Sequence, residues 1–188
     1  MRLTLVASAG FLALTGSMAL APHVEAAAGD APVIVTSGWS GQAETAYAAC
    51  PEGTSLVGGG YDSEPHHTGL GAIADAVNAS APSSFKPNTW AVRMDAGAAK
   101  AYAMCSKDSD QAPTVVTSNW SGPAETVYAT CPQGTTLTGG GYDSQPHHTG
   151  FGLVSDAVNA NAPSSFKPNT WAVRMDSGLA KSYAMCTK

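Results

Sequence analysis

The sequence predicts an all-β protein made of two tandem repeats, each an antiparallel β-sandwich or a small barrel. Residues 32–107 align without a gap on residues 113–188, and about three quarters of the aligned positions are identical. Within each repeat, apolar residues alternate with a period of two, and no segment has the 3.6-residue period of an amphipathic helix. Gly and Pro interrupt the chain at short intervals, as they do between the strands of antiparallel sheets.

The chain is expected to begin with an export signal over residues 1–28. Arg2 supplies a positive charge, residues 3–21 form an apolar run thinned by Gly and Ser, and the small residues at 26–28 provide a cleavage site. A membrane anchor is the alternative, but the small-residue stretch follows directly and no later segment approaches a spanning length. We therefore expect a secreted, extracellular protein that does not insert into a membrane after cleavage.

The strands of the first repeat follow from β-branched and alternating runs. The clearest alternation places Trp90, Val92 and Met94 on one face of a strand and Arg93 on the other. The expected strands are residues 33–35, 44–50, 54–61, 90–95 and 101–105, separated by turns at 51–53 and 95–97. Residues 72–79 alternate less cleanly and predict either a strand or a broad loop.

The second repeat, residues 113–188, is expected to repeat these elements. A short polar linker, residues 108–112, joins it to the first, so the two repeats should lie side by side. Where the repeats differ, apolar residues often replace apolar residues, as in Leu70 and Phe151 or Ile73 and Val154. Such exchanges are typical of packed positions, so we expect these side chains to be buried.

Each repeat carries two cysteines, and an exported protein meets an oxidising environment. Four cysteines allow three connectivities, of which only Cys50–Cys105 with Cys131–Cys186 keeps each repeat self-contained. We expect this pairing. A zinc site is the alternative, although no pair of cysteines has the two-residue spacing typical of zinc ligands.

Several short motifs resemble a family of small cysteine-paired β domains in secreted bacterial proteins, particularly those of actinobacteria. They are Cys-Pro-Glu-Gly-Thr at 50–54, Gly-Gly-Gly-Tyr at 58–61, Thr-Trp-Ala-Val-Arg at 89–93 and Ala-Tyr-Ala-Met-Cys at 101–105. Similar modules are found at the C-termini of bacterial collagen-like chains. The resemblance covers both repeats and implies a non-enzymatic accessory or binding module. The segment Pro-His-His-Thr at 65–68 and residues 78–87 lie outside the family pattern.

The composition excludes several function classes. The formal net charge is −5, and Lys and Arg occur singly, so nucleic acid is not an expected partner. No catalytic motif is supported: Ser83 and Lys86 match the Ser-x-x-Lys spelling, but Pro82 and Pro87 exclude the helix which that chemistry needs. We therefore expect a protein that is not an enzyme and needs no cofactor.

The strongest candidate site is the stretch at 58–69, which recurs at 139–150 with a single substitution, Glu64 to Gln145. Tyrosine rings offer flat apolar faces, while Asp and His supply hydrogen bonds. The expected ligand-binding residues are Tyr61, Asp62, His66 and His67 with Tyr142, Asp143, His147 and His148. An alternative uses Asp62, His66, His67 and their counterparts Asp143, His147 and His148 as metal ligands, because imidazole and carboxylate groups bind zinc or copper.

The function we expect is that of a binding module with two equivalent loop sites for an extracellular glycan, cell-wall polymer or secreted protein. One alternative is a secreted protease inhibitor that inserts residues 63–65 or 82–84 into an active site. Another is a small metal-binding protein that uses the paired histidines. The sequence leaves the oligomeric state open.

Overall fold

The computed structural model describes residues 31–107, which we call the first half, and residues 112–188, the second half. Within these residues the protein is all-β, as predicted, with twelve strands in antiparallel sheets, no helix and no closed barrel. The expected signal peptide and residues 108–111 of the expected linker lie outside the described residues. No helix in the described ranges is long and apolar enough to cross a membrane.

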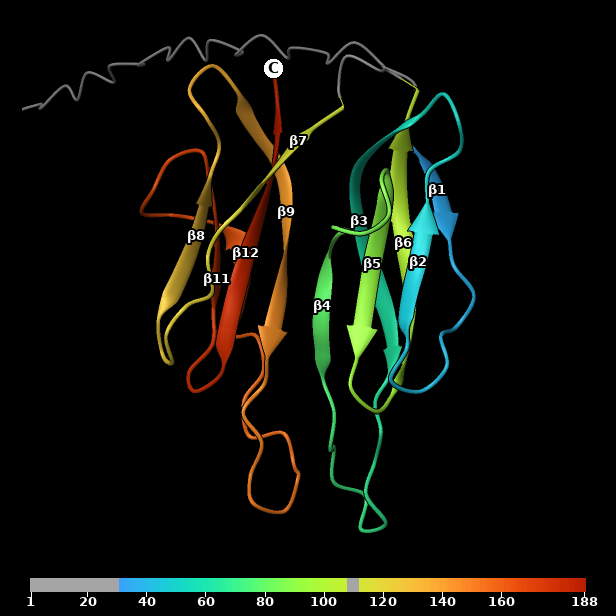
Figure 1. Cartoon of the computed structure of the whole chain (residues 1–188), viewed down its shortest axis with the longest axis vertical. Helices are drawn as coiled ribbons and strands as arrows, with labels where there is room; N and C mark the ends of the chain where they lie inside the picture. The colour runs from blue at the N-terminus through green and yellow to red at the C-terminus, as the bar shows by residue number, and fades with distance from the viewer. Residues whose placement is uncertain (1–30, 108–111) are drawn as a thin grey trace, which may run out of the picture.

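The first half contains two three-stranded layers (Figure 1). One layer has the order β1-β6-β3 and the other β2-β5-β4. The strands are β1 (Val33–Thr36), β2 (Thr45–Ala49), β3 (Ser55–Glu64), β4 (Val77–Pro82), β5 (Thr89–Met94) and β6 (Ala98–Ser106). Residues 72–79, which could not be assigned from their pattern, divide into a loop and the start of β4.

The second half has the same strand orders, β7-β12-β9 and β8-β11-β10. Its strands are β7 (Thr114–Thr117), β8 (Thr126–Thr130), β9 (Thr136–Gln145), β10 (Ala160–Pro163), β11 (Thr170–Arg174) and β12 (Leu179–Thr187). The expected pairing of cysteines is present, with Cys50 bonded to Cys105 and Cys131 to Cys186. Each bond links the segment after the second strand of its half to the last strand.

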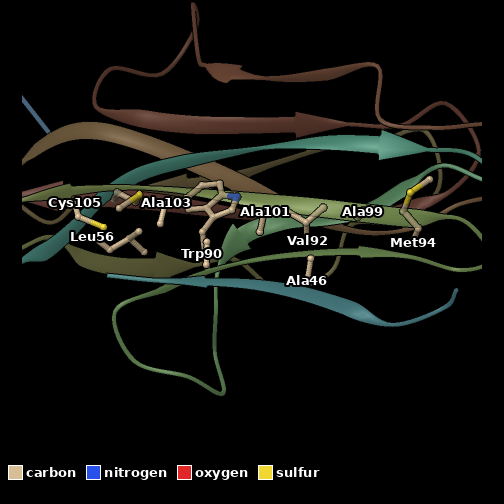
Figure 2. Close-up of a cluster of buried hydrophobic side chains, with 11 residues drawn as sticks. Ala46, Leu56, Trp90, Val92, Met94, Ala99, Ala101, Ala103 and Cys105 are labelled. Carbon is tan, nitrogen blue, oxygen red and sulfur yellow. The ribbon is translucent and has the colours of Figure 1, made fainter. Parts of the chain in front are cut away.

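The core of the first half is built from a few large side chains set among many alanines (Figure 2). Trp90, Val92 and Met94 point inward from β5. Alternate residues of β6, among them Ala99 and Ala101, are fully buried and face them. Small residues on one layer leave room for the Trp90 ring on the other, which explains why an alanine-rich strand can occupy a protein core.

The two halves are joined through one continuous sheet. β4 of the first half pairs antiparallel with β9 of the second, with Ala79 opposite Asp143 and Ser80 opposite Tyr142. The resulting sheet has six strands in the order β2-β5-β4-β9-β12-β7, and Figure 1 shows β4 and β9 side by side. The halves therefore lie beside each other and share backbone hydrogen bonds.

Side chains reinforce this junction. Arg93 Nη2 lies 3.3 Å from Asp143 Oδ1, and the Ser144 hydroxyl donates a 2.9 Å hydrogen bond to the Asn78 carbonyl. Met185 of the second half is fully buried and belongs to the hydrophobic core of the first. The two halves thus share part of their apolar core as well as their sheet.

Candidate functional site

Two long loops extend from the same end of the molecule (Figure 1). The first finger, residues 65–76, lies between β3 and β4, and the second finger, residues 146–157, lies between β9 and β10. Because β4 and β9 are antiparallel, the end of β9 lies beside the start of β4, and both fingers leave the sheet in the same direction. Inside each finger a short bridge pairs the two arms, His67 with Ile73 and His148 with Val154.

The tip of each finger is a tight turn. In the first finger, Gly71 N–H donates to the Thr68 carbonyl at 2.8 Å, and Thr68 N–H donates to the Ala72 carbonyl at 2.8 Å. Gly71 has a φ of +80°, a conformation that glycine adopts without steric cost. The turn satisfies its own backbone groups, so the side chain of Leu70 at its apex has no packing role.

The apex side chains are large, apolar and in solvent. Leu70 is 99% exposed and Phe151, its counterpart on the second finger, is 94% exposed. Together with Thr68, Gly69, Ala72 and Leu153, they line a cleft of about 590 Å³ between the two fingers. The prediction that Leu70 and Phe151 would be packed is therefore wrong, and so is the one for Ile73, which is 53% exposed.

A buried carboxylate fixes the base of each finger. Asp75 accepts hydrogen bonds from the backbone N–H groups of Asp95 and Gly97, in the turn between β5 and β6. Asp156 accepts bonds from the corresponding turn of the second half, from Ser177 N–H at 2.7 Å and Gly178 N–H at 2.8 Å. The fingers are thus tied to the turns beneath them, and the cleft between their tips rests on two anchored supports.

The histidines predicted to bind a ligand lie on the fingers and are exposed. None of the four, His66, His67, His147 and His148, is among the residues that line the cleft. One ring nitrogen of His67, Nδ1, lies 3.3 Å from the Gly71 carbonyl oxygen, across its own turn. The neighbouring carbonyl of His66 accepts a backbone hydrogen bond from Ala74.

The predicted tyrosines and aspartates have different surroundings in the two halves. Tyr61 and Asp62 lie on β3 and are exposed, whereas Tyr142 is buried and Asp143 half-buried where β9 meets β4. The Tyr142 hydroxyl donates to the Val77 carbonyl at 3.1 Å. The eight predicted residues therefore do not form two equivalent surfaces.

Burial at the junction shifts the acid–base properties of these groups. It raises the pKa of the Tyr142 hydroxyl, and the nearby Tyr61 hydroxyl, which hydrogen-bonds to it, raises it further. Burial also raises the pKa of Asp143, and the cations Arg93 and Lys181 offset only part of that effect. Tyr142 and Asp143 act here as packing and pairing groups between the halves.

The structure does not gather the proposed metal ligands. Across residues 31–107 and 112–188, no group of three or more His, Cys, Asp or Glu side chains is arranged to hold a metal ion. Asp62 is on a regular strand, while His66 and His67 are adjacent residues on the arm of a finger that pairs with the opposite arm. Neighbouring residues of a paired segment point to opposite sides, so the two imidazoles diverge.

Two further grooves, which we call the outer grooves, lie on the outer faces of β2-β5-β4 and β8-β11-β10. Each has a floor of alanines and is walled by a tyrosine, a phenylalanine and an arginine at equivalent positions: Tyr47, Phe85 and Arg93 in the first half, and Tyr128, Phe166 and Arg174 in the second. Their volumes are about 80 and 300 Å³, and Asp143 and Tyr183 of the second half border the smaller one. A lysine lies over each tyrosine ring, Lys86 at 3.8 Å and Lys167 at 3.9 Å from the ring centroid.

Sequence reasoning missed the apolar finger tips and these grooves. The signal for the tips was present in the pattern Thr-Gly-Leu-Gly at 68–71, because a large apolar residue between two glycines lies at the apex of a turn and not within a strand. The grooves had no local signal, because their walls come from three separate strands and a loop.

Comparisons with protein-family models, with curated proteins and with solved structures found no match to this chain.

Proposed function

We propose that the protein is a secreted, non-enzymatic binding module that holds an apolar side chain of an extracellular protein between its two finger tips. The single observation that carries the proposal is the pair of apex side chains, Leu70 and Phe151, both almost completely exposed and lining one cleft. The cleft is lined almost entirely by apolar groups, which suits an apolar anchor better than a polar ligand.

Folding does not account for these side chains. Apex positions of tight turns are usually occupied by Gly, Asn, Asp or Ser. The turns here are closed by backbone hydrogen bonds and by the hydroxyls of Thr68 and Thr149, without any contribution from the apex side chains. Both halves nevertheless place a large apolar residue at the apex, while the glycines on either side are the same. Exposed apolar patches rimmed by polar groups are characteristic of surfaces that bind a partner.

The charges on the two fingers fit a protein partner better than a lipid surface. Neither finger contains a lysine or an arginine, so nothing there attracts anionic headgroups. The paired disulfides are consistent with the oxidising environment of an extracellular protein. The base of each finger is already anchored by hydrogen bonds, so the finger loses little conformational entropy when a partner binds. A smaller entropy loss favours affinity.

A second candidate function is glycan binding at the two outer grooves. Its support is the repetition of the same aromatic, arginine and serine groups around both grooves. Aromatic faces stack on sugar rings and arginine binds hydroxyl or acidic groups. The same experiment tests this candidate, because Phe85 and Phe166 of the grooves are also largely exposed and can be replaced in the same way as the finger apices.

Removing the apolar apices separates the two candidates. We expect a phage-displayed peptide library to yield ligands with an aromatic or aliphatic anchor that bind the mature wild-type protein. The double variant Leu70→Ser with Phe151→Ser should bind these peptides at least about tenfold more weakly, a loss of about 1.4 kcal/mol or more, because each buried apolar side chain contributes about 1.5–3 kcal/mol. Peptide affinity is measured by titration calorimetry.

The matched control is Phe85→Ser with Phe166→Ser, which removes two largely exposed aromatic rings from the grooves. It should keep peptide affinity, and both double variants should unfold like the wild type, since exposed substitutions rarely cost more than about 0.5 kcal/mol. A glycan array is probed in parallel, and binding lost only in the control variant would identify the grooves as the site. The wild type could instead bind phosphatidylcholine vesicles and no peptide, and lose vesicle binding when the finger apices are replaced. That result would contradict a protein partner and identify a lipid surface as the ligand.

A further inference from the structure

The two outer grooves are built from the same residue types but differ in size. The first groove, in the first half, has a volume of about 80 Å³, and the second groove, in the second half, about 300 Å³. Ten residues line the second groove, and the ten residues at the corresponding positions of the first are identical in type. The first groove is bordered in addition by Asp143 and Tyr183, which both belong to the second half. The second half therefore narrows the first groove and leaves its own groove open.

The first groove already holds a carboxylate, and that carboxylate comes from the chain itself. Arg93 Nη2 lies 3.3 Å from Asp143 Oδ1, whereas Arg174 Nη2 in the second groove lies 3.2 Å from Asp176 Oδ1, two positions along its own chain segment. Arg93 has an acid at the same spacing, Asp95, but no ion pair joins them within residues 31–107 and 112–188. A carboxylate that enters the groove thus replaces the local acid as the partner of the guanidinium group.

The second groove offers the same cation to an outside ligand. Among the described residues, none that lines this groove is acidic. The side chains of Arg174 and Asp176 are 53% and 60% exposed, so their ion pair contributes little and can be exchanged for another. Lys167, over the ring of Tyr128, supplies a second positive charge beside the groove. The planar guanidinium group of arginine suits a carboxylate, which it binds through two parallel hydrogen bonds.

The walls of the second groove suit a sugar ring that carries the carboxylate. Phe166 is largely exposed at one wall, alanines form the floor, and the hydroxyls of Ser164 and Ser165 lie at the rim. An aromatic face and a floor of small apolar groups bind the apolar face of a ring, while hydroxyls bind its polar edge. An aspartate or glutamate side chain of a protein would reach Arg174 but leave the aromatic wall uncovered. The groove therefore fits an acidic sugar better than an acidic peptide.

We propose that the second outer groove binds a uronic acid residue of an extracellular acidic polysaccharide, and that Asp143 closes the first groove to the same ligand. The sugar carboxylate takes the place of Asp176 on Arg174, and the ring lies against Phe166. This proposal rests on the glycan-binding function of the outer grooves and is independent of the cleft between the finger tips. The chain therefore has one acidic-sugar site, although the repeat supplies the residues for two.

Titration calorimetry with oligosaccharides of galacturonic, glucuronic and mannuronic acid tests the proposal. At least one of them should bind the mature protein with one site per chain, and its methyl ester should bind at least tenfold more weakly, because the ester keeps the ring but removes the charge. Arg174→Gln should weaken binding at least tenfold. Arg93→Gln, the same change in the first groove, should alter neither the affinity nor the number of sites. Two sites per chain, or a loss of binding in Arg93→Gln, contradicts the closure of the first groove.

A gain of affinity provides an independent test. Asp176→Asn removes the acid that competes for Arg174, so it should strengthen binding of the same oligosaccharide about two- to fivefold, the range that an exposed ion pair commonly contributes. Asp95→Asn is the matched control in the first half and should leave the affinity unchanged. Both positions are exposed, so both variants should keep the circular dichroism spectrum of the wild type. A weaker binding by Asp176→Asn contradicts the exchange of partners on Arg174.

The remaining outcomes separate this proposal from the functions on which it borders. Equal binding of acid and ester that depends on Phe166 would overturn carboxylate recognition but keep the grooves as glycan sites. Binding of a glutamate-rich peptide through Arg174, with no binding of the oligosaccharides, would overturn the sugar as ligand, and so would the absence of all binding. Leu70→Ser with Phe151→Ser should bind the oligosaccharide like the wild type, and a loss there would mean that the acidic sugar binds at the fingers instead.

Discussion

At the scale of single residues, the most informative groups are the two aspartates at the bases of the fingers. Burial opposes the ionisation of Asp156, but backbone N–H donors, chiefly those of Ser177 and Gly178, outweigh it and hold the pKa of this carboxyl below its ordinary value. A carboxylate that accepts several N–H bonds is stabilised in its charged form. The finger is thus fixed by a contact between backbone N–H groups and the carboxylate that is stronger when Asp156 is ionised.

This contact predicts a dependence of stability on pH. A carboxyl whose pKa is lower in the folded state stabilises the protein above its unfolded pKa of about 4 and loses that contribution as the pH falls through the folded value. Asp156→Asn should therefore cost about 1–3 kcal/mol at pH 7. Urea unfolding of both proteins at pH 7 and at pH 2.5 measures the difference, which should shrink in acid. A difference that does not change between the two pH values would show that the charge is not involved.

At the scale of elements, alternation predicted strands well where one face is buried and the other is not. The strand at 90–95 was predicted because Trp90, Val92 and Met94 face the core, and β5 spans Thr89–Met94. The fingers were harder, because their arms pair with each other outside the sandwich and have no buried face to impose a period. For the same reason the start of β4 at Val77 could not be found within the ambiguous run 72–79.

The central residue of the glycine triplet at 58–60 must be glycine because of packing between β3 and β5. A methyl group on Gly59 of β3 would overlap the indole ring of Trp90 on β5, and Gly140 has the same relation to Trp171. The two layers can approach closely only where the strand has no side chain. The triplet therefore lets a large ring fill the space between two sheets otherwise lined by alanines.

Gly59→Ala should destabilise the first half by about 1–3 kcal/mol or more, because the ring must move off its preferred position in a close-packed core. Chemical unfolding followed by tryptophan fluorescence reports the effect. Gly69→Ala is the matched control: a methyl group at this exposed position meets nothing within 4 Å, so its effect should be small. Equal losses in the two variants would contradict a packing role.

At the scale of the whole molecule, the repeat predicted two halves of the same kind but could not predict how they join. Tyr142 and Asp143 have the same sequence context as Tyr61 and Asp62, so no pattern distinguishes a residue at the junction from one on an open edge. The distinction arises only when β9 meets β4 while β3 and β10 stay apart. A site predicted as two equivalent copies therefore divides into one pair of junction residues and one exposed pair.

The shared sheet and the insertion of Met185 into the first core couple the stabilities of the halves. We expect the mature protein to unfold in one calorimetric transition, since opening the junction exposes apolar surface on both sides. Gly141→Ala should separate that transition into two, because the methyl group collides with the Ser80 carbonyl and Ala81 on β4 and forces the strands apart. Gly150→Ala, in open space at a finger tip, should keep the single transition. Two transitions in the wild type would mean that the halves fold independently despite the continuous sheet.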